Sequence, residues 1–96
     1  MKIRGLIWLE NVVEKLAVKH QVNQEEVEAV FDNPKKPAIM KMQKGHFRGE
    51  DVYRALGQTT SGRYLAVFFI HKLTHEALIL SARDMDSKER RSYAKH

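Results

Sequence analysis

The residues best suited to chemistry lie near the C-terminal end of the chain. An apolar run over residues 79–82 stops at Arg83, and a helix signal begins three residues later at Asp86. The predicted helix carries further cations, namely Lys88, Arg90 and Arg91. An arginine fork where a strand ends, beside a basic helix, is suited to holding a phosphate group. The sequence therefore predicts a phosphate-binding site at this end of the chain.

The charge distribution points in the same direction. The net charge is +5, from 17 basic and 12 acidic residues. Residues 10–32 contain six acids and two lysines, whereas residues 33–48 contain five bases and no acid, and residues 83–96 contain five bases and three acids. A basic middle and end favour a polyanionic partner such as nucleic acid. A solvated basic surface without a ligand is an equally open interpretation.

The first third of the sequence predicts a short strand and two helices. Residues 2–8 have the composition of an edge strand. Apolar residues then recur at helical spacing from Leu9 to His20. A second helix should begin at Asn23, because Glu26 three residues on completes a capping box. It should end before Pro34, since proline disfavours the helical conformation in the preceding residue.

The rest of the chain predicts four strands and a short terminal helix. The strands are expected at residues 37–43, 51–58, 64–70 and 76–82, and the helix opens with Asp86 and Glu89. Met40 and Met42 alternate on one face and are expected in the core. The fold class is α+β, as one domain over residues 1–96. The two early helices should cover one face of an antiparallel sheet of about four to five strands, leaving the other face partly open.

Several classes of function are disfavoured by what the sequence lacks. There is no cysteine, so no disulfide and no thiolate metal site can form. His71 and His75 span a predicted loop and not one helix, so a zinc site is not expected, and no cofactor is expected either. The N-terminal apolar run is too short for an export signal, which predicts a cytoplasmic protein with no membrane partner.

Four blocks of residues resemble the BrnT toxins of bacterial type II toxin–antitoxin modules. The first runs from Lys19-His20 through Glu25-Glu26-Val27 to the Val30–Pro34 segment. The second begins at Gly49-Glu50 and continues through Tyr53 and Ala55-Leu56-Gly57 to Thr59, and the third is Gly62-Arg63-Tyr64-Leu65 with the strand that follows. The fourth runs from Ile79 to Arg83 and includes Glu89-Arg90-Arg91 and Tyr93. The order and spacing of all four fit the family.

Three positions depart from the family pattern. Gln21 stands where a glycine usually follows the lysine–histidine pair, and Val52 stands where an arginine is frequent. Arg54, two residues beyond Val52, lies on the same strand face and can replace that arginine. His46 lies one residue further from Gly49-Glu50 than the family pattern has it.

The resemblance implies a RelE-like ribonuclease fold and a metal-independent endoribonuclease toxin. A cognate BrnA-type antitoxin of the ribbon-helix-helix class would neutralise it, and operator DNA would be contacted only through that antitoxin. Two alternatives stay open. One is a non-catalytic module of the same fold that still binds a protein or RNA. The other is a nucleic-acid-binding domain that acts alone.

Metal-free cleavage of RNA needs a base, an acid and cations that stabilise charge on phosphorus. Arg83 and Arg54 are the candidate cations, and His46 and Glu50 are the candidate base and acid. Arg54 and Arg83 are expected to lie near each other on the uncovered face, with Glu50 as the anion between them. Each has a structural alternative. Arg83 could form a salt bridge with Glu50 or Asp84, Arg54 could belong to a buried ion pair, and His46 could be an exposed loop histidine.

The remaining site candidates are residues that would contact the RNA backbone or a base: Lys44, Arg48, Lys88, Arg90, Arg91 and Tyr93. Tyr93 could stack on a base or pin the terminal helix to the sheet, and pinning is the favoured interpretation. His20, which closes an apolar helical stripe, is expected in a structural role, and His71 and His75 are expected at the surface.

Overall fold

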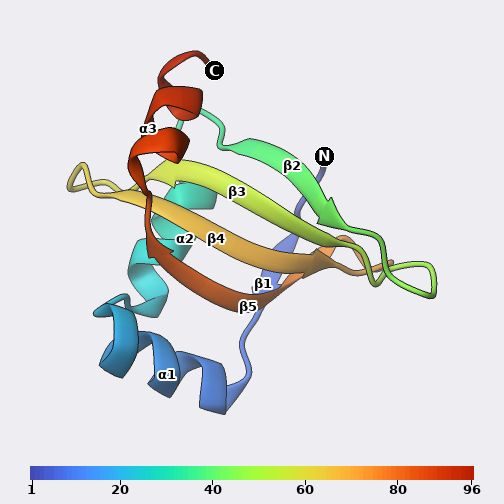
Figure 1. Ribbon diagram of the computed structural model, residues 1–96. Helices are drawn as coiled ribbons and strands as arrows, with labels where there is room; N and C mark the ends of the chain where they lie inside the picture. Colours follow the sequence, from blue (N-terminus) through green and yellow to red (C-terminus); the bar gives the residue numbers. More distant parts are fainter.

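A computed structural model describes residues 1–96 as a five-stranded sheet with helices on both faces. The elements in chain order are β1 (Gly5–Ile7), α1 (Glu10–His20), α2 (Gln24–Asp32), β2 (Ala38–Gln43), β3 (Val52–Gln58), β4 (Tyr64–His71), β5 (Glu76–Asp84) and α3 (Ser87–Ala94). Helices α1 and α2 lie on one side of the sheet and α3 lies on the other (Figure 1). The predicted α+β class is confirmed. No helix combines the length and apolar character that a membrane span requires.

The sheet is mixed, with strand order β1-β5-β4-β3-β2. Strands β2 to β5 form the predicted antiparallel meander. However, β1 pairs in parallel with β5, with Gly5 opposite Glu76, so the prediction of a purely antiparallel sheet is wrong at this strand. Parallel neighbours need a long crossover. Here the crossover consists of all the elements from α1 to β4. A strand of three residues is too short to show in its sequence which strand it pairs with.

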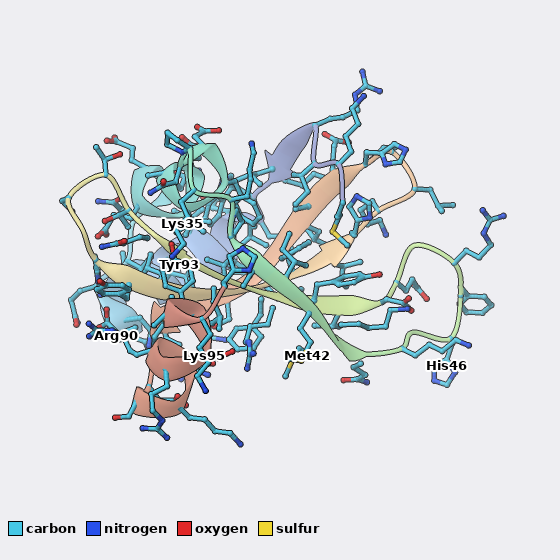
Figure 2. The ribbon with its side chains drawn as sticks, turned by 90° about the horizontal axis from the view of Figure 1, so that it is seen from above. Lys35, Met42, His46, Arg90, Tyr93 and Lys95 are labelled. Carbon is cyan, nitrogen blue, oxygen red and sulfur yellow. The ribbon has the colours of Figure 1, made fainter.

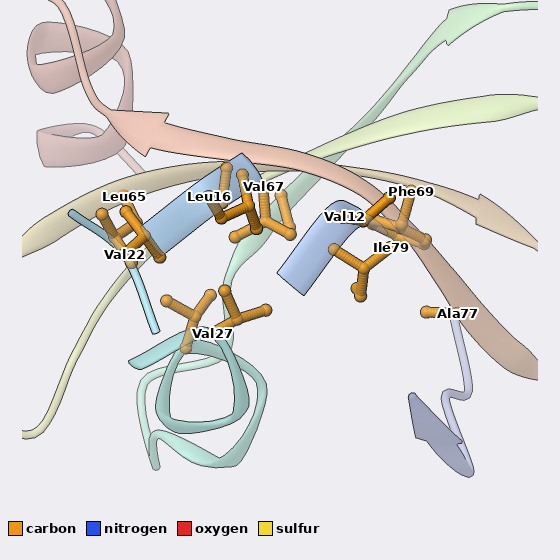
Figure 3. Packing of buried hydrophobic residues seen from close by; sticks show 12 residues of the cluster. Val12, Leu16, Val22, Val27, Leu65, Val67, Phe69, Ala77 and Ile79 are labelled. Carbon is orange, nitrogen blue, oxygen red and sulfur yellow. The ribbon is translucent and has the colours of Figure 1, made fainter. Parts of the chain in front are cut away.

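The main core lies between the sheet and helices α1 and α2. Val12 and Leu16 of α1 belong to the same buried cluster as Val67, Phe69 and Ile79 of the sheet (Figure 3). Helix α2 also approaches closely, because a Cβ atom added at Gly57 of β3 would lie 2.6 Å from Val30 Cγ1. Alternate residues of the central strands therefore pack under these two helices, as the apolar pattern predicts.

The opposite face has a smaller core beneath α3. Leu56 and Ala66 of the sheet are buried there with Met85 and Tyr93. The expectation that Met40 and Met42 are core residues is wrong, since they are 52% and 46% exposed. Both belong to β2, which is an edge strand, and the short α3 does not cover them. This face is thus only partly covered.

Both predicted capping boxes are present. The Asn23 side chain accepts a hydrogen bond from the Glu26 N–H, and the Glu26 carboxylate accepts from the Asn23 N–H. Asp86 and Glu89 make the same reciprocal pair at the start of α3. Each box satisfies donors that a helix N-terminus otherwise leaves free, so α2 and α3 begin where the sequence predicts.

Arg63 fastens the turn between α1 and α2 to the end of the sheet. Its guanidinium donates to both carboxylate oxygens of Asp84, to Glu26 Oε2, and to the carbonyls of His20 and Gln21. These five bonds use all five N–H donors of the side chain. The third block of the resemblance therefore contains a structural clamp, a role that its sequence alone did not reveal.

We expect Gln21→Gly to raise the free energy of unfolding by about 0.5–1 kcal/mol. Gln21 has φ 49°, in the left-handed region, and caps the C-terminus of α1. Glycine adopts this conformation without the steric cost that a Cβ atom imposes. Chemical denaturation at neutral pH measures the change. Gln21→Ala keeps the Cβ atom and serves as the control. A glycine variant no more stable than the alanine variant would contradict the argument.

Candidate functional site

Two arginines from different strands meet one carboxylate on the face that carries α3. Arg83 Nη1 and Nη2 lie 2.6 and 3.0 Å from Glu89 Oε1 and Oε2. Arg54 Nη1 lies 3.5 Å from Glu89 Oε2. Arg83 comes from β5, Arg54 from β3 and Glu89 from α3. These three residues are called the arginine–glutamate cluster below.

Glu89 is the most buried charged side chain of the cluster. The residue is 4% exposed. Burial on its own would raise the pKa of Glu89, but hydrogen bonds from Arg83 and from the Asp86 N–H hold that pKa below its ordinary value. The same contacts raise the pKa of Arg83, chiefly through its hydrogen bonds to Glu89. The carboxylate therefore stays ionised at neutral pH and fixes both guanidinium groups.

The two arginines differ in how much of each remains accessible. The Arg54 side chain is 15% exposed, and its Nε is buried without a hydrogen-bond partner. The Arg83 side chain is 37% exposed. Three of its donors are used by Glu89 and by the Asp84 carbonyl, and a guanidinium has five. Arg83 thus keeps two N–H groups for a ligand, while Arg54 is placed to support Glu89.

Arg54 and Arg83 lie close together, as predicted, but the carboxylate between them is a different one from that predicted. The sequence predicts Glu50 in that position, and the structure places Glu89 there instead. Glu50 is exposed and makes no salt bridge. A residue that was predicted only as a helix cap is therefore the one that unites the two arginines.

The other sequence-predicted residues divide into two separate groups. Lys44, His46, Arg48 and Glu50 lie on the exposed β2–β3 loop. Figure 2 shows His46 at the opposite end of the molecule from Arg90, Tyr93 and Lys95 of the C-terminal segment. The structure thus does not bring His46 to the arginine–glutamate cluster. Its assignment as a base stays a prediction.

Helix α3 presents the second basic group, close to the cluster. Lys88, Arg90 and Arg91 are exposed, and the Arg90 guanidinium lies 3.8 Å from the centre of the Tyr64 ring. Tyr93 is only 2% exposed, with Lys35 Nζ 4.1 Å from its ring centre, so the ring is not available to stack on a base in this structure. Tyr93 packs α3 against the sheet.

Sequence reasoning missed one residue on the β2–β3 loop. Phe47 is 74% exposed between His46 and Arg48. An aromatic side chain within a run of basic residues is a feature of surfaces on which bases stack, and that signal was present in the sequence. For Glu89 no signal existed beyond its capping box, because ion pairing across the sheet depends on the tertiary fold. No three histidine, aspartate or glutamate side chains gather as a possible metal site.

The fold and the site define a small α+β protein with a cationic face next to a partly open sheet. Comparison with protein families matches residues 8–89 to the family described as "Ribonuclease toxin, BrnT, of type II toxin-antitoxin system". The chain belongs to this family, which confirms the resemblance seen in the sequence. No curated protein matches the chain. The family indicates a ribonuclease toxin with an RNA substrate and a protein antitoxin as partner.

We expect Glu89→Gln to lower the free energy of unfolding at pH 7 by about 2–4 kcal/mol, because it leaves Arg54 buried without its carboxylate. The free energy of unfolding of the variant should also fall less than that of the unmodified chain when the pH is lowered. The folded-state pKa of Glu89 lies below its ordinary value of 4.5. Its contribution is therefore complete above pH 4.5 and is lost as the pH falls through the lower, folded value.

Denaturation at pH 7 and at about pH 3 measures both effects. Glu14→Gln, at an exposed position of α1, is the matched control. If both variants show the same small loss and the same pH dependence, the buried cluster does not hold α3 in place.

Proposed function

We propose that the chain is a metal-independent endoribonuclease toxin whose cleavage face is the side of the sheet that carries α3. The observation that carries this proposal is the arginine–glutamate cluster. It presents a partly exposed Arg83 with two free donors beside the cations of α3. The family match to ribonuclease toxins supports it, and a RelE-like fold, which the resemblance to BrnT toxins implies, is part of the proposal.

Each residue has a proposed task in this account. Arg83 binds the scissile phosphate and stabilises the charge that develops on it. Glu89 and Arg54 act as positioning residues for Arg83. Lys88, Arg90 and Arg91 bind the neighbouring RNA backbone. Such contacts are sequence-independent and sensitive to salt.

The base and acid are proposed to come from the β2–β3 loop. RNA that runs from Arg83 across the uncovered half of the face would pass Met40 and Met42 and approach that loop. His46 and Glu50 would then supply proton transfer, with Lys44 and Arg48 on the backbone. The exposure of all these loop residues is compatible with contact to a long single strand.

The proposed partner is a BrnA-type antitoxin of the ribbon-helix-helix class. The toxin itself would contact operator DNA only through this partner. An acidic antitoxin segment that covers the cations of α3 would block RNA by occupying the same charges. The proposed compartment is the cytoplasm, where the RNA substrate is found.

A non-catalytic module of the same fold is the second candidate, and one observation favours it. Glu89 already occupies the outer edge of the Arg83 guanidinium, and Arg54 is largely buried. In such a module the cluster would be purely structural. The protein would bind RNA or an antitoxin without cleaving it.

We expect expression of the chain alone to arrest the growth of a bacterial host, and Arg83→Ala to relieve the arrest. Arg83→Ala removes the two hydrogen bonds that Arg83 gives to the buried Glu89, which should cost about 3–5 kcal/mol of stability. Circular dichroism of the purified variant must therefore show that it is folded before relief of the arrest counts as loss of cleavage. Inducible expression with colony counts measures the effect. Lys15→Ala, on the exposed face of α1, removes a charge elsewhere and should remain toxic.

The same two variants should differ in the rate at which the purified protein cleaves RNA. The unmodified chain and Lys15→Ala should cut single-stranded RNA in buffer with EDTA, whereas Arg83→Ala should be slower by roughly a hundredfold or more. Activity that disappears with EDTA and returns with magnesium or zinc would overturn metal independence. Intact RNA under all conditions would favour the non-catalytic module.

A further inference from the structure

A second cluster of ionisable side chains lies at the other end of the sheet. A pocket of about 320 Å³ is formed where the β2–β3 loop meets the turn between β4 and β5. Its lining includes Arg48, Asp51, Tyr53, His71, Lys72 and His75. His71 alternates with Phe69 along β4, so it lies on the α1–α2 side of the sheet, away from Arg83. The pocket is therefore separate from the arginine–glutamate cluster.

The N-terminal segment contacts the ring of His71 and the backbone of His75. Their ring centres are 5.5 Å apart. His71 Nε2 lies 2.9 Å from the Lys2 carbonyl oxygen, which can only accept, so Nε2 carries the hydrogen and Nδ1 is left for another partner. His75 has φ 69° and is fixed by backbone bonds from its N–H to the Lys72 carbonyl and from the Arg4 N–H to its own carbonyl. Such a backbone conformation in a residue other than glycine is uncommon and is enriched at functional sites.

The charge around the pocket is positive. Arg48 and Lys72 contribute two cations to its lining. Asp51, the single acid of the lining, is already bound to Lys41 Nζ at 2.9 Å and accepts from the Gly45 N–H. These bonds, led by the one from Gly45, hold its pKa below the ordinary value. Glu76, at the start of β5, accepts a hydrogen bond from Thr74, and Glu50 lies next to the lining residues Gly49 and Asp51. No carboxylate forms a salt bridge with Arg48 or Lys72.

We propose that this pocket binds a phosphate group, with Lys72, Arg48 and His75 as its donors. Neither Arg48 nor Lys72 is in a salt bridge, so both cations can bind the anion. The pocket is of a size that admits one phosphate and leaves room for an attached nucleoside. The ligand is thus a phosphate group, supplied either by an RNA strand or as the free ion. This site does not depend on cleavage at Arg83.

The test follows the imidazole NMR signals of the full chain during two titrations, one with inorganic phosphate and one with a short 2′-O-methyl RNA that cannot be cleaved. His71 and His75 should shift with saturation, because both imidazoles line the pocket. His20, on α1, is the internal reference and should stay constant. Half-saturation at tenfold lower RNA than phosphate concentration would assign the site to RNA, and the reverse order would assign it to the free ion.

Two variants make the outcome decisive. Lys72→Met removes one donor charge without touching the backbone bonds of the turn and should weaken binding about tenfold, whereas Lys15→Met should bind like the unmodified chain. Arg83→Ala should leave the His71 and His75 shifts intact, so a failure of the proposed cleavage site can be told apart from a failure of this pocket. If neither imidazole shifts in either titration, or if Lys72→Met binds like the unmodified chain, the proposal is overturned.

Discussion

The structure of the cationic face depends on one buried carboxylate. Glu89 is 4% exposed and accepts hydrogen bonds from the Asp86 N–H and from both Nη atoms of Arg83, with Arg54 close by. A buried charge is tolerated only when its partners replace the lost hydration. Glu89 therefore requires α3 to begin at Ser87, β5 to extend to Asp84, and Arg54 to lie beneath the helix. The position of every cation on this face follows from that requirement.

The other capping-box glutamate works in the same way at the opposite face. Glu26 caps α2 through the Asn23 N–H and accepts from Arg63, which also binds Asp84. In both places a local helix signal supplies an anion to a distant arginine. The two clamps meet at the end of β5, because Arg83 and Asp84 are adjacent in sequence and their side chains serve different faces. This end of the sheet is therefore the most strongly cross-linked part of the molecule.

Local signals explain what the sequence predicts well. Both capping boxes act over three residues, and the four meander strands follow from apolar alternation and turn residues, so these helices and strands agree with the prediction to within one or two residues. The first strand, expected at residues 2–8, spans only Gly5–Ile7. Long-range pairing was not predictable in the same way. The three residues of β1 contain no sequence pattern that predicts their parallel pairing with β5. The exposure of Met40 depends on how far α3 reaches over β2.

In the candidate site, too, local features were predictable from the sequence and long-range contacts were not. Arg54 and Arg83 were identified because charges interrupt apolar strands, a feature visible in the sequence. Two neighbouring guanidinium groups need an anion between them, and the sequence prediction gave that role to Glu50. The fold instead sends the β2–β3 loop away from the cluster, so the loop cations and the α3 cations form two separate groups (Figures 1 and 2). An RNA strand long enough to touch both would cross the uncovered half of the sheet.

The most direct test of the central claim is whether the free donors of Arg83 contact RNA. The Nε–H signal of Arg83 can be followed by NMR while a 2′-O-methyl RNA strand is added to the intact chain. The account predicts a saturable shift of the Arg83 signal, accompanied by shifts in the backbone amides of α3. An Arg83 signal that stays constant while RNA binds elsewhere on the protein would contradict it.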